Sequence, residues 1–259
     1  MNIQSLHKED NNISFLFKGI NPVIANTIRR LIVNEVPVMA IETIEFNKND
    51  SVLYDETIAH RLGLVPLTTD LKSYNLPKEC KCEGKGCQSC QLKLVLKVKG
   101  PCIVYSSELK SQDPKVKPFY DGIPIVKLLK DQDLVLEATA ILGKGVDHMK
   151  FSPGLVVYRG YPEFIIKQNS NIKNFVEKCP KGLCKADGRK IEIIDILKWN
   201  EACFDYAQEN NIDIKLSEED YIFEIESWGQ LIVKEMLLNS LKIFDEKLDE
   251  FSKLLKKIK

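Results

Sequence analysis

The C-terminal segment constrains the fold most, because its apolar residues recur at alternating spacings of four and three. They are Leu237, Leu241, Phe244, Leu248, Phe251, Leu255 and Ile258. This spacing predicts a helix whose apolar side chains form a single seam. A helix of roughly 25 residues at the end of a chain cannot cover so long a seam with its own small domain. We therefore expect a partner helix, with burial inside the chain as the alternative.

A second helix is predicted near the N-terminus. Asn21 is suited to cap it, Pro22 to be its first residue, and Pro37 to end it. The apolar residues that fall on one face are Ile24, Ile28, Leu31 and Ile32. The adjacent Arg29 and Arg30 lie off this face. We expect one side of the helix to pack and the two arginines to face a polar surface or solvent.

The composition limits the possible partners. Lys plus Arg and Asp plus Glu both number 37, so the formal net charge is zero. No global basic field therefore favours nucleic acid as the main partner. The sequence shows no apolar run of roughly 18 residues, no signal peptide and no lipidation motif, so we expect a cytoplasmic protein without membrane contact. Eight cysteines in such a chain favour metal or redox chemistry over structural disulfides.

Four of these cysteines form a compact motif around Gly84 and Gly86. They are Cys80, Cys82, Cys87 and Cys90, arranged as C-x-C and C-x-x-C. Each short pair can occupy two corners of a tetrahedral shell, which favours one structural zinc ion. An iron–sulfur cluster and metal-free thiols are the alternatives. Four thiolates leave no position open for a metal-bound water, which disfavours a hydrolytic or deaminase role.

Three further cysteines, Cys179, Cys184 and Cys203, lie in a segment with its own pattern. That segment predicts helix at 172–178, strand at 190–194, helix at 196–208 and strand at 212–216, the order of a small α+β unit. Cys179-Pro180 is similar to the end of a ferredoxin motif, but the C-x-x-C-x-x-C run is missing. We expect buried thiols or a Cys179–Cys184 disulfide here, and no iron–sulfur cluster.

The remaining pattern is rich in strands and carries no catalytic constellation. Strands are predicted at 13–17, 41–46, 92–99, 102–105, 134–142 and 221–226, with a short helix at 55–64 and a surface loop at 111–124. His60 and His148 each lack a second histidine, a nucleophile or an acidic partner at motif spacing. No acidic triplet suited to two-metal nucleotidyl transfer is present. We expect structural or interface roles for both histidines.

Four stretches resemble one known family. They are Ala25 to Arg30 (ANTIRR), Ala59 to Leu67 (AHRLGLVPL), Gly143 to Pro153 (GKGVDHMKFSP) and Tyr221 to Gly229 (YIFEIESWG). They resemble the assembly subunits of RNA polymerase: the bacterial α subunit, the third-largest subunit of eukaryotic RNA polymerase II and the archaeal D subunit. The resemblance implies an α+β fold with an α-like dimerisation domain formed by 1–40 and 220–259. A β-rich domain at 41–163 with the metal loop, and a ferredoxin-like insert at 164–219, would interrupt it.

The resemblance also implies a function. The chain would be a non-catalytic platform that pairs with a smaller subunit, L, through its C-terminal helix and recruits the large catalytic subunits. Residues similar to the family's contact with the large subunits are Arg29, Arg30, His60, Arg61 and His148. Contact with DNA would occur only through the complex. The alternatives are a zinc-loop DNA-binding regulator, which neutral charge and acidic strands disfavour, and a ferredoxin-like electron-transfer protein.

Overall fold

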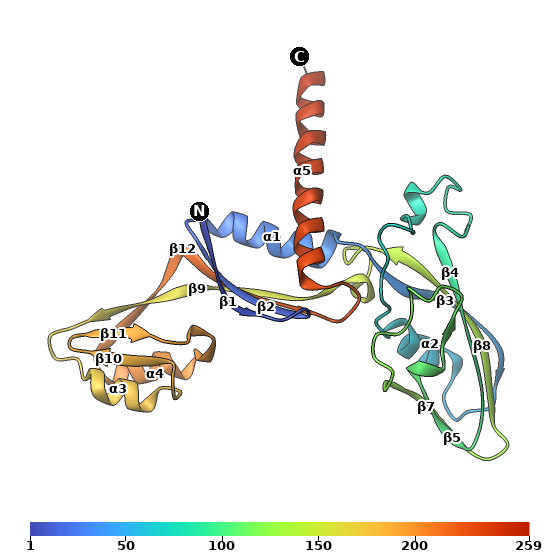
Figure 1. Ribbon diagram of the computed structural model, residues 1–259, viewed down its shortest axis with the longest axis horizontal. Coiled ribbons are helices and arrows are strands. Elements are labelled where there is room, and N and C mark those ends of the chain that lie inside the picture. The colour runs from blue at the N-terminus through green and yellow to red at the C-terminus, as the bar shows by residue number, and fades with distance from the viewer. Residues whose placement is uncertain (259) are drawn as a thin grey trace. The chain divides into compact units, whose positions relative to one another are not determined.

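The computed structural model describes residues 1–258 and has a mixed α+β fold (Figure 1). Lys259, the last residue of the predicted dimerisation segment, lies outside the described residues. The strands are β1 (Asn2–Lys8), β2 (Asn12–Lys18), β3 (Val38–Asn49), β4 (Gln91–Lys99), β5 (Cys102–Tyr105), β6 (Lys110–Ser111), β7 (Pro124–Leu128), β8 (Asp133–Gly143), β9 (Gly154–Ile166), β10 (Cys184–Asp187), β11 (Lys190–Ile193) and β12 (Ile212–Ser227). The helices are α1 (Pro22–Glu35), α2 (Asp55–Gly63), α3 (Ile172–Lys178), α4 (Ala202–Glu209) and α5 (Val233–Lys257).

The chain divides into two compact units. The first contains residues 1–8, 14–25 and 157–224, and the second contains residues 9–13, 26–156 and 225–259. Strands β1, β2, β12 and β9 form one sheet in that order. No helix among the described residues is long and apolar enough to cross a membrane.

The first unit is built around a β-α-β-β-α-β order of elements from β9 to β12, which is the ferredoxin-like order. Strands β10 and β11 form an antiparallel hairpin in which Cys184 lies opposite Ile193. The core contains Phe175, Leu183 and Trp199, all buried. Helix α3 therefore packs on the hairpin through the apolar residues that the sequence places at helical spacing.

The second unit is built on the antiparallel sheet β3-β8-β4-β6. Strand β8 alternates between buried and half-exposed side chains along most of its length, so one face covers the core, as expected for a half-buried strand. Helix α2 covers this core with Ile58 and Leu62, which are fully buried. The predicted strands at 41–46, 92–99, 102–105 and 134–142 and the predicted helix at 55–64 are all present.

The N-terminal helix α1 begins as predicted. The backbone N–H of Ile24 donates a hydrogen bond to Asn21 Oδ1 at 2.8 Å, which is a side-chain cap. Ile24 itself is exposed, whereas Ala25 and Ile32 are fully buried. The prediction that Ile24 packs was therefore wrong: the buried face begins one residue later.

Two predicted elements of the first unit differ from the structure. The predicted helix at 196–208 is a 3-10 turn at Ile196–Lys198 followed by α4, because Asp195 caps the turn and Trp199 is extended and buried. The predicted strands at 212–216 and 221–226 are one continuous strand, β12. Strand β12 lies between β2 and β9 in its sheet, and the polar residues 217–220 remain extended within it.

Candidate metal centre and interaction surfaces

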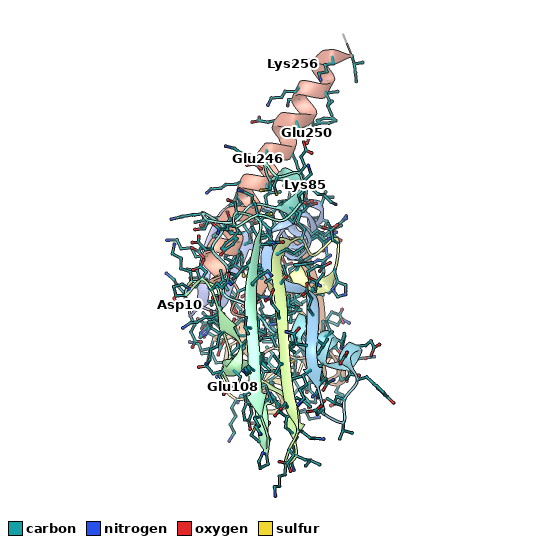
Figure 2. The ribbon with its side chains drawn as sticks, turned by 90° about the vertical axis from the view of Figure 1, so that its right-hand side faces the viewer. Asp10, Lys85, Glu108, Glu246, Glu250 and Lys256 are labelled. Carbon is teal, nitrogen blue, oxygen red and sulfur yellow. The ribbon has the colours of Figure 1, made fainter. Side chains whose placement is uncertain are left out.

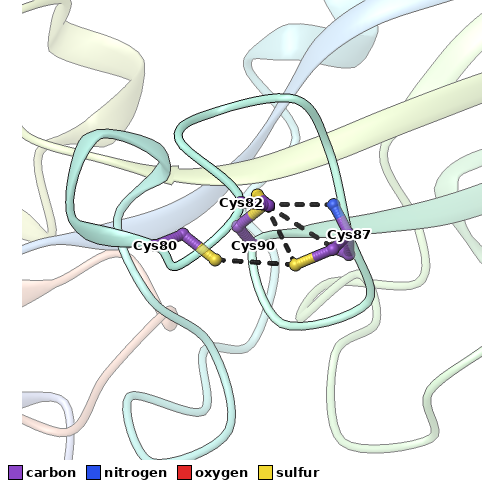
Figure 3. Close-up of side chains that lie close together, drawn as sticks. All are labelled: Cys80, Cys82, Cys87 and Cys90. Carbon is purple, nitrogen blue, oxygen red and sulfur yellow. Dashed lines mark hydrogen bonds between the residues drawn. The ribbon is translucent and has the colours of Figure 1, made fainter.

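The four cysteines of the C-x-C and C-x-x-C motif come together in one loop between the 3-10 turn Pro77–Glu79 and strand β4 (Figure 3). All four sulfur atoms lie within 4.8 Å of one another. The Cys80–Cys87 and Cys82–Cys90 sulfur distances are both 3.5 Å, and the Cys87–Cys90 distance is 3.8 Å. Among the described residues, this is the one group of three or more His, Cys, Asp or Glu side chains gathered closely enough to hold a metal ion.

These distances fit a tetrahedral metal shell. Zinc–sulfur bonds of about 2.3 Å place the sulfurs of a tetrahedron about 3.8 Å apart. A disulfide would require about 2.05 Å, and all four thiols are free. Cys80 and Cys90 are buried, and Cys82 and Cys87 are half-exposed. The four sulfurs and their spacing therefore suit one metal ion with tetrahedral coordination. Its coordination shell would be full, with no position left for a substrate.

Local backbone geometry explains why this sequence gathers its thiols. Glu83, Gly84 and Gly86 all adopt positive φ, a conformation that glycine adopts without steric cost. At Gly86 an added Cβ would lie 2.4 Å from the side chain of Gln91, so no larger residue fits without a shift. The Cys90 N–H donates to the Cys87 carbonyl at 3.0 Å and closes the turn. The prediction that Gly84 and Gly86 form the tight turn agrees with this geometry.

The thiols of this loop differ in acidity. The hydrogen bond from the Cys90 thiol lowers the pKa of Cys82 to about 6. Burial raises the pKa of Cys90 to about 12. The Cys87 N–H also donates to Cys90 Sγ at 3.2 Å, the type of contact that stabilises a metal-bound thiolate. Binding of a cation would therefore displace at least one tightly held proton, and acid would oppose it.

The other cysteines of interest lie in the core of the first unit. Cys179, Cys184 and Cys203 are buried, and all three are free thiols. A hydrogen bond with Cys184, together with burial, raises the pKa of Cys179 well above its usual range, so the first two thiols are neighbours. Cys203 Sγ donates to Asn200 Oδ1 at 3.3 Å. The structure therefore brings Cys179 and Cys184 together inside an apolar core without a disulfide.

The C-terminal seam lies on α5, which is one straight helix (Figure 1). Leu237 and Phe244 are half-buried, whereas Leu241, Leu248, Phe251, Leu255 and Ile258 are exposed. The fully buried side chains of α5 belong to its first turns. Figure 2 shows the charged side chains Glu246, Glu250 and Lys256 along the same helix. The seam is thus an uncovered apolar stripe on an amphipathic helix.

The paired arginines of α1 are not equivalent. Both Nε and Nη2 of Arg29 donate to Asn26 Oδ1 on the same helix, at 3.1 and 2.9 Å. Arg30 is exposed and lines a shallow surface hollow with Asn34 and Lys247. Arg29 is therefore held against its own helix, while Arg30 presents its charge to solvent.

The remaining predicted interface residues lie on α2 and before β9. His60 and Arg61 are exposed in the last turn of α2, and Arg61 Nη1 donates to the carbonyl oxygen of Ile125. His148 is also exposed, and its Nδ1 accepts a hydrogen bond from the N–H of Lys150 at 3.1 Å. His148 thereby caps the 3-10 turn Met149–Phe151. Arg61 and His148 thus have structural contacts as well as exposed surface.

Sequence reasoning missed two features that the structure brings together. Glu35 of α1 forms ion pairs with Lys144 and Lys247, which are distant in sequence. Trp228 and Gln230 line a cavity with residues that follow α2. Both groupings join residues from separate segments, so no local pattern could have indicated them.

Comparisons with known proteins agree with this architecture. Residues 40–154 match the family model described as the RNA polymerase Rpb3/RpoA insert domain. The chain is 36% identical over 259 residues to DNA-directed RNA polymerase subunit Rpo3 of Archaeoglobus fulgidus, which covers 99% of this chain and 98% of that protein.

Two further relatives carry the same name. The subunit Rpo3 of Methanosphaera stadtmanae is 38% identical over 261 residues, covering 96% of each chain. That of Pyrococcus furiosus is 38% identical over 264 residues, covering 99% of this chain and 97% of the relative. These similarities extend from the N-terminal strands through the metal loop to the C-terminal helix. The chain belongs to the family of archaeal DNA-directed RNA polymerase subunit Rpo3.

Proposed function

We propose that this chain is a non-catalytic assembly subunit of a DNA-directed RNA polymerase, the counterpart of the archaeal D subunit, and that it acts in the cytoplasm. The observation that carries the proposal is the similarity to Rpo3 subunits over 99% of the chain. Nucleotidyl transfer belongs to the complex, and this chain supplies positions and contacts for it. DNA is reached only through the assembled enzyme.

The first partner is a smaller subunit, L, which pairs with α5. Five exposed apolar residues of the seam support this pairing, because an isolated chain leaves them in water: Leu241, Leu248, Phe251, Leu255 and Ile258. The half-buried Leu237 and Phe244 continue the same stripe toward the base of the helix. A helix of the partner with a matching heptad stripe would cover all seven side chains.

The second set of partners is the large catalytic subunits. Their proposed contact surface comprises Arg29, Arg30, His60, Arg61 and His148. Exposure of Arg30, His60 and His148 supports this role. Arg29 already donates to Asn26, and Arg61 already donates to the Ile125 carbonyl. These two arginines would therefore shape the contact surface, and they would be less available than Arg30 to pair with a partner's charges.

The four-cysteine loop would hold one structural zinc ion. Its four cysteine sulfurs lie within 4.8 Å of one another, and three of the pairs are 3.5 to 3.8 Å apart. This set supports zinc and leaves no position for a reacting water. The ion would fix the loop that precedes β4. The buried Cys179, Cys184 and Cys203 would remain thiols, without an iron–sulfur cluster.

We further propose the following division into domains. Segments 1–40 and 220–259 would form the dimerisation domain, 41–163 the β-rich domain that carries the metal loop, and 164–219 a ferredoxin-like insert. The β-α-β-β-α-β order of elements from β9 to β12 supports the last assignment.

Co-purification tests the proposal. The chain, tagged and expressed at native abundance, should be recovered with the large polymerase subunits and with a small partner, and the recovered complex should extend RNA on a DNA template. A chain that elutes alone and as a monomer, while polymerase activity elutes elsewhere, would refute the assignment.

A further inference from the structure

A cavity of about 380 Å³ opens in the second unit, beside the end of α2. Leu64 and Met149 line its mouth and are 55% and 56% exposed. Val65, Pro66 and Ile123 add further apolar wall. The cavity is large enough for one long side chain from another protein, and its apolar residues would pack against the aliphatic part of that side chain.

A buried acceptor lies in the wall of this cavity. Gln230 is 5% exposed, and its Nε2 donates to the Ser152 carbonyl at 3.3 Å. That carbonyl requires a donor, which fixes the orientation of the amide and turns Oε1 away from it. Gln230 Oε1 has no hydrogen-bond partner among the described residues. Buried acceptors are rarely left unmatched. Less than 1 Å² of this oxygen is accessible, so a ligand N–H would reach it only after a small shift of the neighbouring side chains.

The charges around the cavity are unbalanced. Lys150 is bound to the Glu42 carboxylate and to the Ile41 carbonyl, the latter at 3.0 Å, so its charge is neutralised locally. Glu226 also lines the cavity and is exposed, and it forms no ion pair with any described residue. The cavity therefore carries one uncompensated carboxylate and favours a cationic occupant.

Trp228 supplies an aromatic face to the same cavity. It is half-buried, and its backbone N–H donates to the Pro153 carbonyl at 3.1 Å. The neighbouring Gly229 has a φ of +100°, and an added Cβ there would lie 2.1 Å from the Phe119 ring. This close packing holds the turn that presents Trp228 and Gln230. A flat cation can stack on such an indole ring.

We propose that this cavity receives an arginine side chain carried by one of the large polymerase subunits, an assignment of the partner that rests on the proposed function. The aliphatic stem would pass Leu64 and Met149, and the guanidinium would pair with Glu226, stack on Trp228 and donate to Gln230. Arginine alone combines five donors, a planar cation and an apolar stem. A tyrosine would give Glu226 no opposite charge, and a lysine would bring no planar group to stack on Trp228.

The full-length chain provides a direct test. The chain contains two tryptophans, so a Trp199→Phe variant leaves Trp228 as the only indole reporter. We would titrate it with Nα-acetyl-arginine amide and with the uncharged isostere Nα-acetyl-citrulline amide. The arginine compound should change Trp228 emission saturably and bind about tenfold more tightly than the citrulline compound, because one charge-assisted pair is lost in the latter. Saturation-transfer NMR on the unmodified chain gives the same comparison without altering the core at Trp199.

Two exposed glutamates of the same unit supply matched variants. Glu226→Gln should weaken the arginine compound to the level of the citrulline compound, whereas Glu108→Gln should leave the preference unchanged. Absence of saturable binding, equal binding of the two compounds, or a preference that survives Glu226→Gln would each overturn the proposal.

Reconstitution with the other polymerase subunits separates this proposal from the proposed function. Glu226→Lys should lower recovery of the large subunits at least about fivefold in moderate salt, and Glu108→Lys should not. Assembly that is normal with Glu226→Lys would overturn the proposal and leave the assembly function standing. If the wild-type chain recruits no large subunit, the partner named here and the proposed function both fail, and the titration alone decides whether the cavity binds guanidinium groups.

Discussion

Glu35, at the end of α1, and Lys247, in the middle of α5, form an ion pair with an Oε1–Nζ distance of 2.7 Å. The other carboxylate oxygen of Glu35 lies 3.4 Å from Lys144 Nζ. Burial of Glu35 raises its pKa, but the hydrogen bonds and charges of Lys247 and Lys144 outweigh this and lower it from 4.5. One carboxylate thus ties α5 to the end of α1 and to the segment that follows β8.

This ion pair predicts a specific acid response. Because the pKa of Glu35 is lower in the folded state, its stabilisation is complete above the ordinary glutamate pKa. It is lost as pH falls through the lowered value. Glu35→Gln should reduce the free energy of unfolding by about 0.5 to 1 kcal/mol at pH 7, and the difference from wild type should shrink below about pH 4. Denaturant unfolding at several pH values measures both effects. Glu246→Gln, which removes the carboxylate next to Lys247 on α5, is the control, and an equal loss in that variant would contradict the prediction.

The four-cysteine loop should bind about one zinc ion per chain. Elemental analysis of freshly purified protein measures the metal, and Cys87→Ser with Cys90→Ser should abolish it. Removal of the metal should disorder residues 76–91 locally, seen as faster amide exchange there, while the rest of the second unit stays folded. The reason is that the loop joins a sheet with its own large apolar core. Cys102→Ser, which alters a thiol outside the cluster, should leave the metal in place. Metal content unaffected by the double serine variant would refute this site.

The cysteines of the first unit should not hold a four-iron cluster. Cys179, Cys184 and Cys203 supply three thiolates, and the fourth corner would have none. Protein purified without oxygen should be colourless, and these thiols should react with a thiol reagent only after unfolding, because all three are buried. Brown protein whose visible absorbance disappears in Cys203→Ser would contradict this prediction, a three-iron cluster being the form to look for.

The seam of α5 should be essential for pairing with the small subunit. Leu241→Asp, Leu248→Asp or Phe251→Asp each places a carboxylate in an apolar interface and removes a packed side chain. The cost should be several kcal/mol of binding free energy per variant. Because these residues are exposed in the unpaired chain, its own unfolding free energy should change little. Lys253→Asp, on the opposite face of the helix, is the matched control. Co-elution of the seam variants with the small partner would show that another surface makes the pair.

The arginines of α1 should act in recruitment, not in pairing. Arg29→Ala with Arg30→Ala should leave the heterodimer intact and weaken binding of the large subunit by roughly 2 to 5 kcal/mol if the charges are desolvated there. Arg30→Ala should account for most of the loss, since Arg29 is held by Asn26. Size-exclusion chromatography followed by large-subunit capture separates the two steps. A double variant that loses the small partner yet still captures the large subunit would reverse the assignment of these surfaces.

Much of the fold and site follows from local patterns. The four metal-loop cysteines lie within one short loop, so their spacing alone brought them together, and Asn21 caps α1 as its residue type predicts. Strand β9 was not predicted, because Gly160 and Pro162 interrupt the sequence pattern typical of a strand. Proline is tolerated there since β9 is an edge strand of its sheet.

The parts that could not be predicted depend on distant segments. The Ser-Glu-Glu-Asp stretch at 217–220 has the composition of a turn, yet it lies within β12, an inner strand of its sheet. The ion pair of Glu35 joins residues 212 positions apart, and no short-range signal marks it. The heptads predict which face of α5 is apolar. They do not identify the segments that bury the first turns of the helix.

The uncovered stripe of α5 also bears on how the cell must handle this polypeptide. A newly made copy presents a row of leucines and phenylalanine to every other copy. Under the proposed pairing with a small subunit, self-association would compete with correct pairing until that subunit arrives. Surplus copies would be substrates for chaperones and proteases. The amount of this polypeptide that persists should therefore follow the supply of its partner, and balanced synthesis of the two becomes a requirement imposed by a single helix face.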